Sequence, residues 1–150
     1  MERILSGEFD VTLDEAGRIS LPRRLREIME KDKVVLTKGA DICLWLFIAE
    51  DWKEEVKKIV ASTNRYSASD RDIRRRYIGP AHELEIDKQG RILIASPLRE
   101  FAGLVKDCYV VGQYDYLEIW DNDKYKSCQR NENEMKERSE ELSNKLRGNG

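Results

Sequence analysis

Arg18 and Arg91 each stand one residue after a glycine and four residues after an aspartate. Aspartate can hydrogen-bond the backbone that follows it, and glycine adopts positive φ without steric cost, so both strings predict tight turns. An arginine at the exit of a rigid turn can bind phosphates or donate two hydrogen bonds to guanine in the major groove of DNA. Alternatively, each Asp–Arg pair is a local ion pair that braces its turn. The residues assigned to bracing the two turns are Asp14, Gly17, Asp87 and Gly90.

The two turns belong to a longer internal repeat. Residues 14–27 match residues 87–100 at an offset of 73, with seven identities in fourteen positions. The similarity continues between 34–46 and 108–120, with the offset lengthened by one residue. Two copies are too few for a solenoid and suit a pseudo-twofold pair. The expected organisation is a first repeat with its helix (5–60), a linker with a short helix (61–80), a second repeat (81–128) and a polar helical or disordered tail (129–150).

Two further arginines, Arg23 and Arg24, fall in the first turn of a short helix that we expect to begin at Pro22. They point away from the apolar stripe of that helix. Because the helix dipole disfavours basic residues at an N-terminus, their position indicates another use, such as phosphate contact, although solvated surface is an equal alternative. The second copy has Ala-Ser-Pro at 95–97 in place of Pro-Arg-Arg, and so carries two fewer positive charges there.

The elements that would position these arginines are short. Alternating residues predict a strand at 8–13, with 18–21 as the return strand of a hairpin and a second hairpin formed by 33–36 and 42–47. Helices are expected at 50–60 and 69–78, and a weak surface or oligomer-contact helix after 129. Isolated hairpins are marginal and open sheet edges are a liability. We therefore expect a mainly β chain with flanking helices, in which both repeats interleave into one β-barrel.

The charge of the chain is unevenly distributed. Of its 150 residues, 40% are hydrophobic and 37% charged, with a net charge of −2 and an isoelectric point near 5.6. These values argue against a uniformly basic nucleic-acid binder, but residues 18–31 carry a net charge of +3. The run Arg74–Arg76 has aspartates within helical reach, which predicts a solvated or inter-subunit face. A local basic surface is therefore compatible with the acidic total.

Several function classes lack the residues that they need. The three cysteines are widely spaced and include no Cys-x-x-Cys pair, which argues against a disulfide framework or a zinc cluster. His82 is the only histidine, so neither a catalytic triad nor a histidine-based metal site can be assembled. No apolar run approaches a membrane span, and the N-terminus lacks a signal-peptide pattern. We expect a cytosolic protein that is not an enzyme and uses no cofactor.

Taken together, these strings resemble the MraZ family of bacterial transcriptional regulators. The resemblance rests on the two Asp-x-x-x-Arg turns, Pro-x-x-Leu-Arg-Glu at 22–27, Gly-Gln at 112–113 and Glu-Ile-Trp-Asp at 118–121. It covers roughly residues 5–125. Members of this family carry two AbrB-type domains in one chain, so the resemblance implies a double-split, swapped-hairpin β-barrel built from two AbrB-like repeats.

The resemblance also implies a function. It indicates a cytoplasmic, nucleoid-associated regulator, most simply a repressor, that binds short direct repeats in double-stranded DNA upstream of the division and cell-wall gene cluster, its own gene included. It implies a ring-like homo-oligomer, with no membrane partner and no small-molecule substrate. The family's DNA-contacting arginine falls on Arg18, and its duplicate falls on Arg91. The alternative is a ring-forming protein-interaction scaffold without sequence-specific DNA binding.

Overall fold

The computed structural model describes residues 4–29 and 33–148. The first copy of the repeat contains β1 (Glu8–Thr12), β2 (Arg18–Ser20), α1 (Arg23–Met29), β3 (Val34–Lys38), β4 (Leu44–Ile48) and α2 (Ala49–Ala61). After α3 (Ala68–Tyr77), the second copy contains β5 (His82–Leu84), β6 (Arg91–Leu93), α4 (Ser96–Ala102), β7 (Asp107–Gly112), β8 (Tyr116–Asp121) and α5 (Asn122–Cys128). The chain continues with α6 (Glu132–Gly148). Over the described residues the helices hold more of the chain than the strands, so the fold mixes helix and sheet rather than being mainly β.

The two copies interleave strand by strand, as expected. One antiparallel sheet has the order β1-β7-β8-β4-β3-β5, and β2 and β6 form a separate two-stranded ribbon. The six-stranded order is unchanged when each strand is replaced by its counterpart in the other copy. In the ribbon, Ile19 lies opposite its own repeat equivalent, Ile92. A pseudo-twofold axis therefore passes through the middle of the ribbon and between β4 and β8.

The first predicted hairpin, in which 18–21 returns along 8–13, is wrong, because the strands of the two copies are exchanged. The turn after β1 forms. Among the described residues, however, β2 is joined to the segment that leaves β1 by a single isolated β-bridge, between Leu13 and Ile19. β1 pairs with β7 instead, and β2 pairs with β6. The physical reason is that a lone three-residue hairpin arm buries little, whereas cross-copy pairing buries the side chains of both central isoleucines completely. The second predicted hairpin, β3 with β4, is confirmed as an antiparallel pair.

The described strands do not close into a barrel. The six-stranded sheet ends at β1 on one side and at β5 on the other. The sheet and the ribbon nevertheless share one apolar core. Ile19 and Ile92 from the ribbon pack with Leu36 and Leu44 from the sheet, all with no exposed surface. Interleaving is thus observed, and the shared core ties the ribbon rigidly to the sheet.

The two short helices beside the ribbon follow the repeat. α1 buries Leu25 and Met29, and α4 buries their repeat equivalents Leu98 and Ala102. Each helix begins within three residues of the end of a ribbon strand. A short connection of this kind fixes where the arginines of the helix lie relative to the turns, which decides the geometry of the candidate site.

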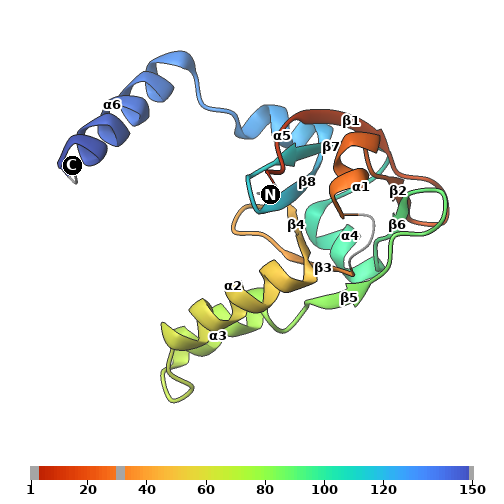
Figure 1. Ribbon diagram of the computed structural model, residues 1–150, viewed down its shortest axis with the longest axis horizontal. Helices are drawn as coiled ribbons and strands as arrows, with labels where there is room; N and C mark the ends of the chain where they lie inside the picture. Colours follow the sequence, from red (N-terminus) through yellow and green to blue (C-terminus); the bar gives the residue numbers. More distant parts are fainter. Residues whose placement is uncertain (1–3, 30–32, 149–150) are drawn as a thin grey trace.

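The remaining helices lie outside this core. α2 and α3 form an arm that extends from the sheet, and α6 extends from another part of the molecule (Figure 1). The predicted helices at 50–60, 69–78 and after 129 are confirmed, and α6 contains no buried residue. None of the helices in the described part of the chain is long and apolar enough to cross a membrane.

The basic run of α3 is only partly the predicted solvated face, and the inter-subunit alternative stays a prediction. Arg74 Nε donates to Thr63 Oγ1 at 2.8 Å and ties α3 to the end of α2. Arg76 Nε donates to the Gly39 carbonyl oxygen at 3.0 Å and ties α3 to the loop between β3 and β4. Only Arg75 makes its contact within the helix, where it forms an exposed ion pair. Two of the three guanidiniums therefore hold the arm to its own chain.

Candidate nucleic-acid interface

The β2–β6 ribbon places both candidate arginines on one surface. Alternate residues of a strand point to opposite faces, and directly opposed residues of an antiparallel pair point to the same face. Ile19 and Ile92 are fully buried, so their neighbours in each strand face outward. Arg18 lies opposite Leu93, whose side chain is 53% exposed, and Ser20 lies opposite Arg91. The outward face therefore presents two arginines related by the pseudo-twofold axis.

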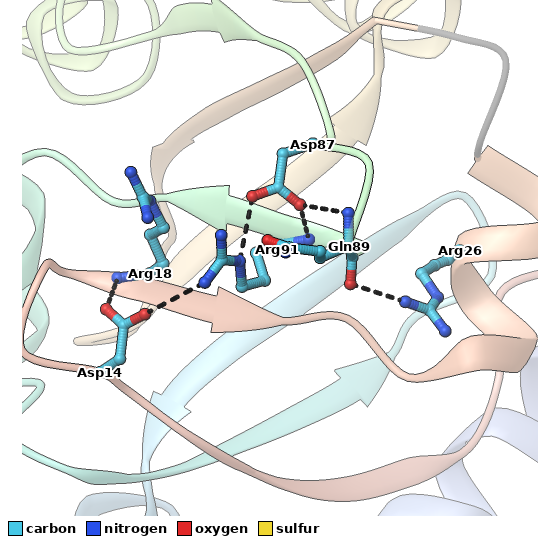
Figure 2. A network of polar contacts seen from close by, with 6 residues as sticks. All are labelled: Asp14, Arg18, Arg26, Asp87, Gln89 and Arg91. Carbon is cyan, nitrogen blue, oxygen red and sulfur yellow. Dashed lines mark hydrogen bonds and ion pairs between the residues drawn. The ribbon is translucent and has the colours of Figure 1, made fainter.

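The first turn holds the backbone of Arg18 and leaves its side chain unpaired. The Gly17 N–H donates to the Asp14 carbonyl oxygen at 3.0 Å, and the Arg18 N–H donates to Asp14 Oδ1 at 2.8 Å. Gly17 has a φ of +85°, which favours glycine. Among the described residues, none forms a hydrogen bond or ion pair with the Arg18 guanidinium (Figure 2). The Asp14–Arg18 ion pair of the alternative interpretation is therefore absent from the described residues, although Asp14 does accept the backbone N–H of Arg18.

The second turn, by contrast, holds its arginine by the side chain. Asp87 Oδ1 accepts the N–H groups of Gln89 and Arg91 at 2.9 and 2.8 Å, and Asp87 Oδ2 accepts Arg91 Nε at 3.0 Å. A guanidinium nitrogen of Arg91 also lies 4.0 Å from Asp14 Oδ2. The Arg91 side chain is only 30% exposed. Figure 2 shows it between the carboxylates of the two turns. These contacts favour the bracing alternative for Asp87 and Arg91, which stays a prediction.

These hydrogen bonds lower the pKa of the Asp87 carboxyl group. Hydrogen bonding from the Arg91 N–H, and then from the Arg91 side chain and the Gln89 N–H, lowers the pKa of Asp87 below its ordinary value of 3.8. A lowered folded-state pKa means that the bracing contacts stabilise the turn above pH 3.8 and are lost as the pH falls through the lower value.

We expect NMR titration of the Asp87 side-chain carboxyl carbon to give a midpoint below 3.8 in the folded protein. In Arg91→Ala the midpoint should rise only partly, because the backbone N–H of residue 91 still donates to Asp87. The same carbon in chemically unfolded protein provides the control. A folded-state midpoint at or above the unfolded value would contradict the bracing role of Asp87.

Arg23 and Arg24 lie on the exposed side of α1, as expected for residues outside its apolar stripe. Arg23 Nε lies 3.3 Å from Glu27 Oε1, and Arg24 donates to Ser6 Oγ at 3.2 Å. Contacts of this exposed kind contribute little to stability, so both guanidiniums are available to an anionic partner. Glu30 and Lys31, which contribute to the predicted basic segment, lie outside the described residues.

α1 of the first copy and the turn of the second copy together line a cavity of about 320 Å³. Its lining includes Arg23 and Arg26 from α1 and Asp87, Lys88 and Gly90 from the turn. Arg26 and its repeat equivalent Arg99 were not predicted as site residues, and neither were the exposed Ser20 and Leu93. The identity of Arg26 and Arg99 within the repeat was the available signal.

The described residues contain no candidate metal site, and two of the three cysteines are buried. In the described part of the chain, no group of histidine, cysteine, aspartate and glutamate side chains is placed to hold a metal ion. Burial raises the pKa of the Cys108 thiol to about 11 and also raises that of Cys43, so both thiols stay protonated at neutral pH. Cys128 is exposed.

Comparison with known proteins points to one family. A family model described as "MraZ protein, putative antitoxin-like" matches residues 4–76 and again residues 77–147. A protein of Treponema denticola named "Transcriptional regulator MraZ" is 40% identical over 139 residues, covering 92% of this chain and 96% of the relative. Proteins of the same name from Acetivibrio thermocellus and Treponema pallidum are 39% and 38% identical and cover 85% and 84% of this chain, and 87% and 85% of their own lengths.

Proposed function

Since this chain belongs to the MraZ family, we propose that it is a DNA-binding transcriptional regulator whose DNA contact is the outward face of the β2–β6 ribbon. The observation that carries the proposal is Arg18. Its guanidinium lies on a rigid, outward-facing ribbon and has no partner among the described residues. A two-stranded ribbon fits the major groove of B-DNA, where arginine can donate two hydrogen bonds to guanine.

The two copies contribute unequally in this proposal. Arg18 is free to bind DNA without breaking an existing ion pair. Arg91 must first exchange its contacts with Asp87 and Asp14 for contacts with DNA. Arg91 therefore adds less affinity than Arg18. Arg23 and Arg24 supply phosphate contacts that fix the orientation of the protein on the duplex, because their present partners bind them only weakly.

The proposal extends to assembly and targets. We infer a ring-like homo-oligomer that places several ribbons on successive direct repeats, so that effective concentration raises the affinity of the whole. The targets inferred from the family are repeats upstream of the division and cell-wall gene cluster, with repression of the chain's own operon. This role places the protein in the cytoplasm, associated with the nucleoid, as a regulator and not an enzyme. The shared core of sheet and ribbon supports a split barrel formed by the repeats at 5–60 and 81–128, joined by the linker at 61–80.

The test is a fluorescence-anisotropy titration of the full chain against a duplex from its own upstream region and against a scrambled duplex. We expect tighter binding to the specific duplex at about 50 mM salt and a steep loss of affinity by about 200 mM, since each phosphate contact contributes about −0.9 to the slope of log K against log salt. Equal, weak binding to both duplexes would overturn the proposal.

A protein-interaction scaffold is the second candidate, favoured by the acidic net charge of −2. In that reading the projecting arm formed by α2 and α3 would be the docking element (Figure 1). Two arginines of that arm are already engaged with their own chain, which weakens the candidate. The same titration decides, because a scaffold shows no preference between the specific and the scrambled duplex.

A further inference from the structure

We propose that Arg26 and Arg99 are positioning residues that hold the two DNA-binding turns crosswise. Arg26 of α1, in the first copy, holds the turn that carries Arg91, and Arg99 of α4, in the second copy, holds the turn that carries Arg18. This inference rests on the proposed function, because it states how Arg18 and Arg91, the proposed DNA-contacting arginines, are held in position. It assigns a role to Arg26 and Arg99, which are identical in the two copies of the repeat and take no part in the proposed DNA contact.

Arg26 reaches across the copies to the second turn. Its guanidinium nitrogen Nη1 donates to the Gln89 carbonyl oxygen at 2.9 Å, and Figure 2 shows the side chain extending from α1 toward that residue. The same side chain lies directly over Gly90, so that a methyl group on Gly90 would overlap the Arg26 guanidinium. Gly90 immediately precedes Arg91. Arg26 thus contacts the turn at the two residues before the candidate DNA contact.

Arg99 makes the reciprocal contact with the first turn. Its guanidinium covers Gly17, where a methyl group would overlap Arg99 Nη1. Arg99 Nη1 also donates to the Ile94 carbonyl oxygen, and the Ile94 N–H donates to the Gly17 carbonyl oxygen at 2.9 Å. These contacts join α4, the end of β6 and the first turn. Because Gly17 immediately precedes Arg18, the position of Arg99 constrains the exit direction of Arg18.

The crossing follows from the pseudo-twofold axis. Arg26 and Arg99 are repeat equivalents, as are Gly90 and Gly17, so the packing of a guanidinium on a glycine occurs in both copies. The hydrogen bonds differ, because Arg26 donates to Gln89 within the second turn, whereas Arg99 donates to Ile94 just after β6. The matching backbone bond is repeated too, since the Leu21 N–H donates to the Gly90 carbonyl oxygen at 2.9 Å. Both glycines are buried under the arginines and have positive φ values of +85° and +79°. Glycine is therefore needed twice over, for its backbone angle and for the space that the guanidinium fills.

These contacts distinguish positioning from direct DNA contact. Each arginine is partly buried as a residue, and its guanidinium donates to a backbone carbonyl of its own chain and packs on a glycine. Arg24 on the same helix as Arg26 is exposed, and its one side-chain hydrogen bond among the described residues is to a serine hydroxyl. A phosphate contact would draw Arg26 and Arg99 away from the turns that they cover. Their effect on DNA binding should therefore pass through Arg91 and Arg18.

The experiment is a set of double-mutant cycles on affinity for the specific duplex. Arg99→Met keeps the length of the side-chain stem but removes the guanidinium, and Arg26→Met does the same in the other copy. Each is combined with Arg91→Ala and with Arg18→Lys, which retains the positive charge and is therefore expected to keep measurable binding. We expect Arg99→Met to weaken binding about tenfold in wild type, but about twofold or less once Arg18 has been replaced. In the Arg91→Ala background the full tenfold loss should persist.

The mirror-image result is expected for Arg26→Met, which should couple with Arg91→Ala and not with Arg18→Lys. The slope of log K against log salt should stay unchanged in both single variants. A slope reduced by about 0.9, with equal losses in every background, would make these arginines phosphate contacts and overturn the inference. Equal losses in every background at an unchanged slope would reduce them to general stabilisers, which also overturns it.

Two controls keep the outcome interpretable. Thermal unfolding and size-exclusion chromatography establish that each variant is folded and assembled, and Arg99→Lys replaces Arg99→Met if the latter is not. Arg24→Met is the matched control on α1 and should couple with neither turn. If the wild-type chain binds neither duplex specifically, the proposed function itself fails. If wild type binds specifically and Arg18→Lys weakens it, yet no coupling with Arg99 is seen, only the positioning role fails.

Discussion

Arg18→Ala should lower the affinity for the specific duplex roughly 100-fold, the upper part of the range for losing a bidentate contact to a base. For the assembled protein about 100-fold is the lower bound of the expected loss, because each subunit that contacts DNA loses the same interaction and avidity multiplies the effect. The fold should not change. The Arg18 side chain has no partner among the described residues, and the turn is held by Asp14 through the backbone N–H of residue 18, which alanine retains.

Arg91→Ala is the matched comparison, since it removes the repeat equivalent. We expect a smaller loss, about tenfold at most, because Arg91 is already engaged with Asp87 and Asp14. Arg75→Ala, which removes an exposed arginine from α3, should leave binding unchanged. Anisotropy titration measures the affinities, and size-exclusion chromatography measures assembly. If Arg18→Ala instead disassembled the oligomer or unfolded the chain, Arg18 would be a structural brace and the placement of the site would be wrong.

The second large effect should fall on stability. Ile19→Ala should lower the free energy of unfolding by about 3 kcal/mol, within the range for truncating a fully buried aliphatic side chain. Ile19 has no exposed surface and lies opposite Ile92 at the centre of the ribbon. The truncation leaves a cavity where the two copies meet, so it should destabilise the whole interleaved fold rather than one repeat.

The matched control for Ile19→Ala lies on the other face of the same ribbon. Leu93→Ala removes an aliphatic side chain that is 53% exposed, and the change should stay within about 0.5 kcal/mol, as for most surface substitutions. Urea unfolding followed by circular dichroism gives both free energies. Two separate transitions for Ile19→Ala, with one repeat unfolding before the other, would contradict a single core shared by the copies.

Local features of the site were readable from the sequence alone. The duplication, the two turns and the helices after them depend on residues close together in the chain, namely an aspartate that accepts backbone N–H groups and a glycine that supplies positive φ. The family also follows from such local strings. The predicted turns at Gly17 and Gly90, the second hairpin and the helices were therefore correct, and the two arginines of the outward face were named in advance, whereas Ser20 and Leu93 were not.

The partner of each strand was decided only by the tertiary structure. β2 follows its turn in the manner of a hairpin, yet it pairs with β6, because burying Ile19 against Ile92 gains more than extending a three-residue hairpin. The same long-range pairing makes two similar turns differ. Arg91 enters the space between Asp87 and Asp14, while Arg18 is left unpaired. No local string distinguishes the two turns in this respect, since both contain the same Asp, Gly and Arg.

The sequence therefore determined which residues form the turns and that there are two of them. The tertiary structure decided which arginine is free, which is braced, and that Arg26 and Arg99 each cover the turn of the other copy. The physical reason is how far apart in the sequence the interacting residues lie. Turn geometry depends on hydrogen bonds within about four residues, whereas strand exchange and the crossed arginines depend on contacts between residues more than forty positions apart, which only the shared core brings together.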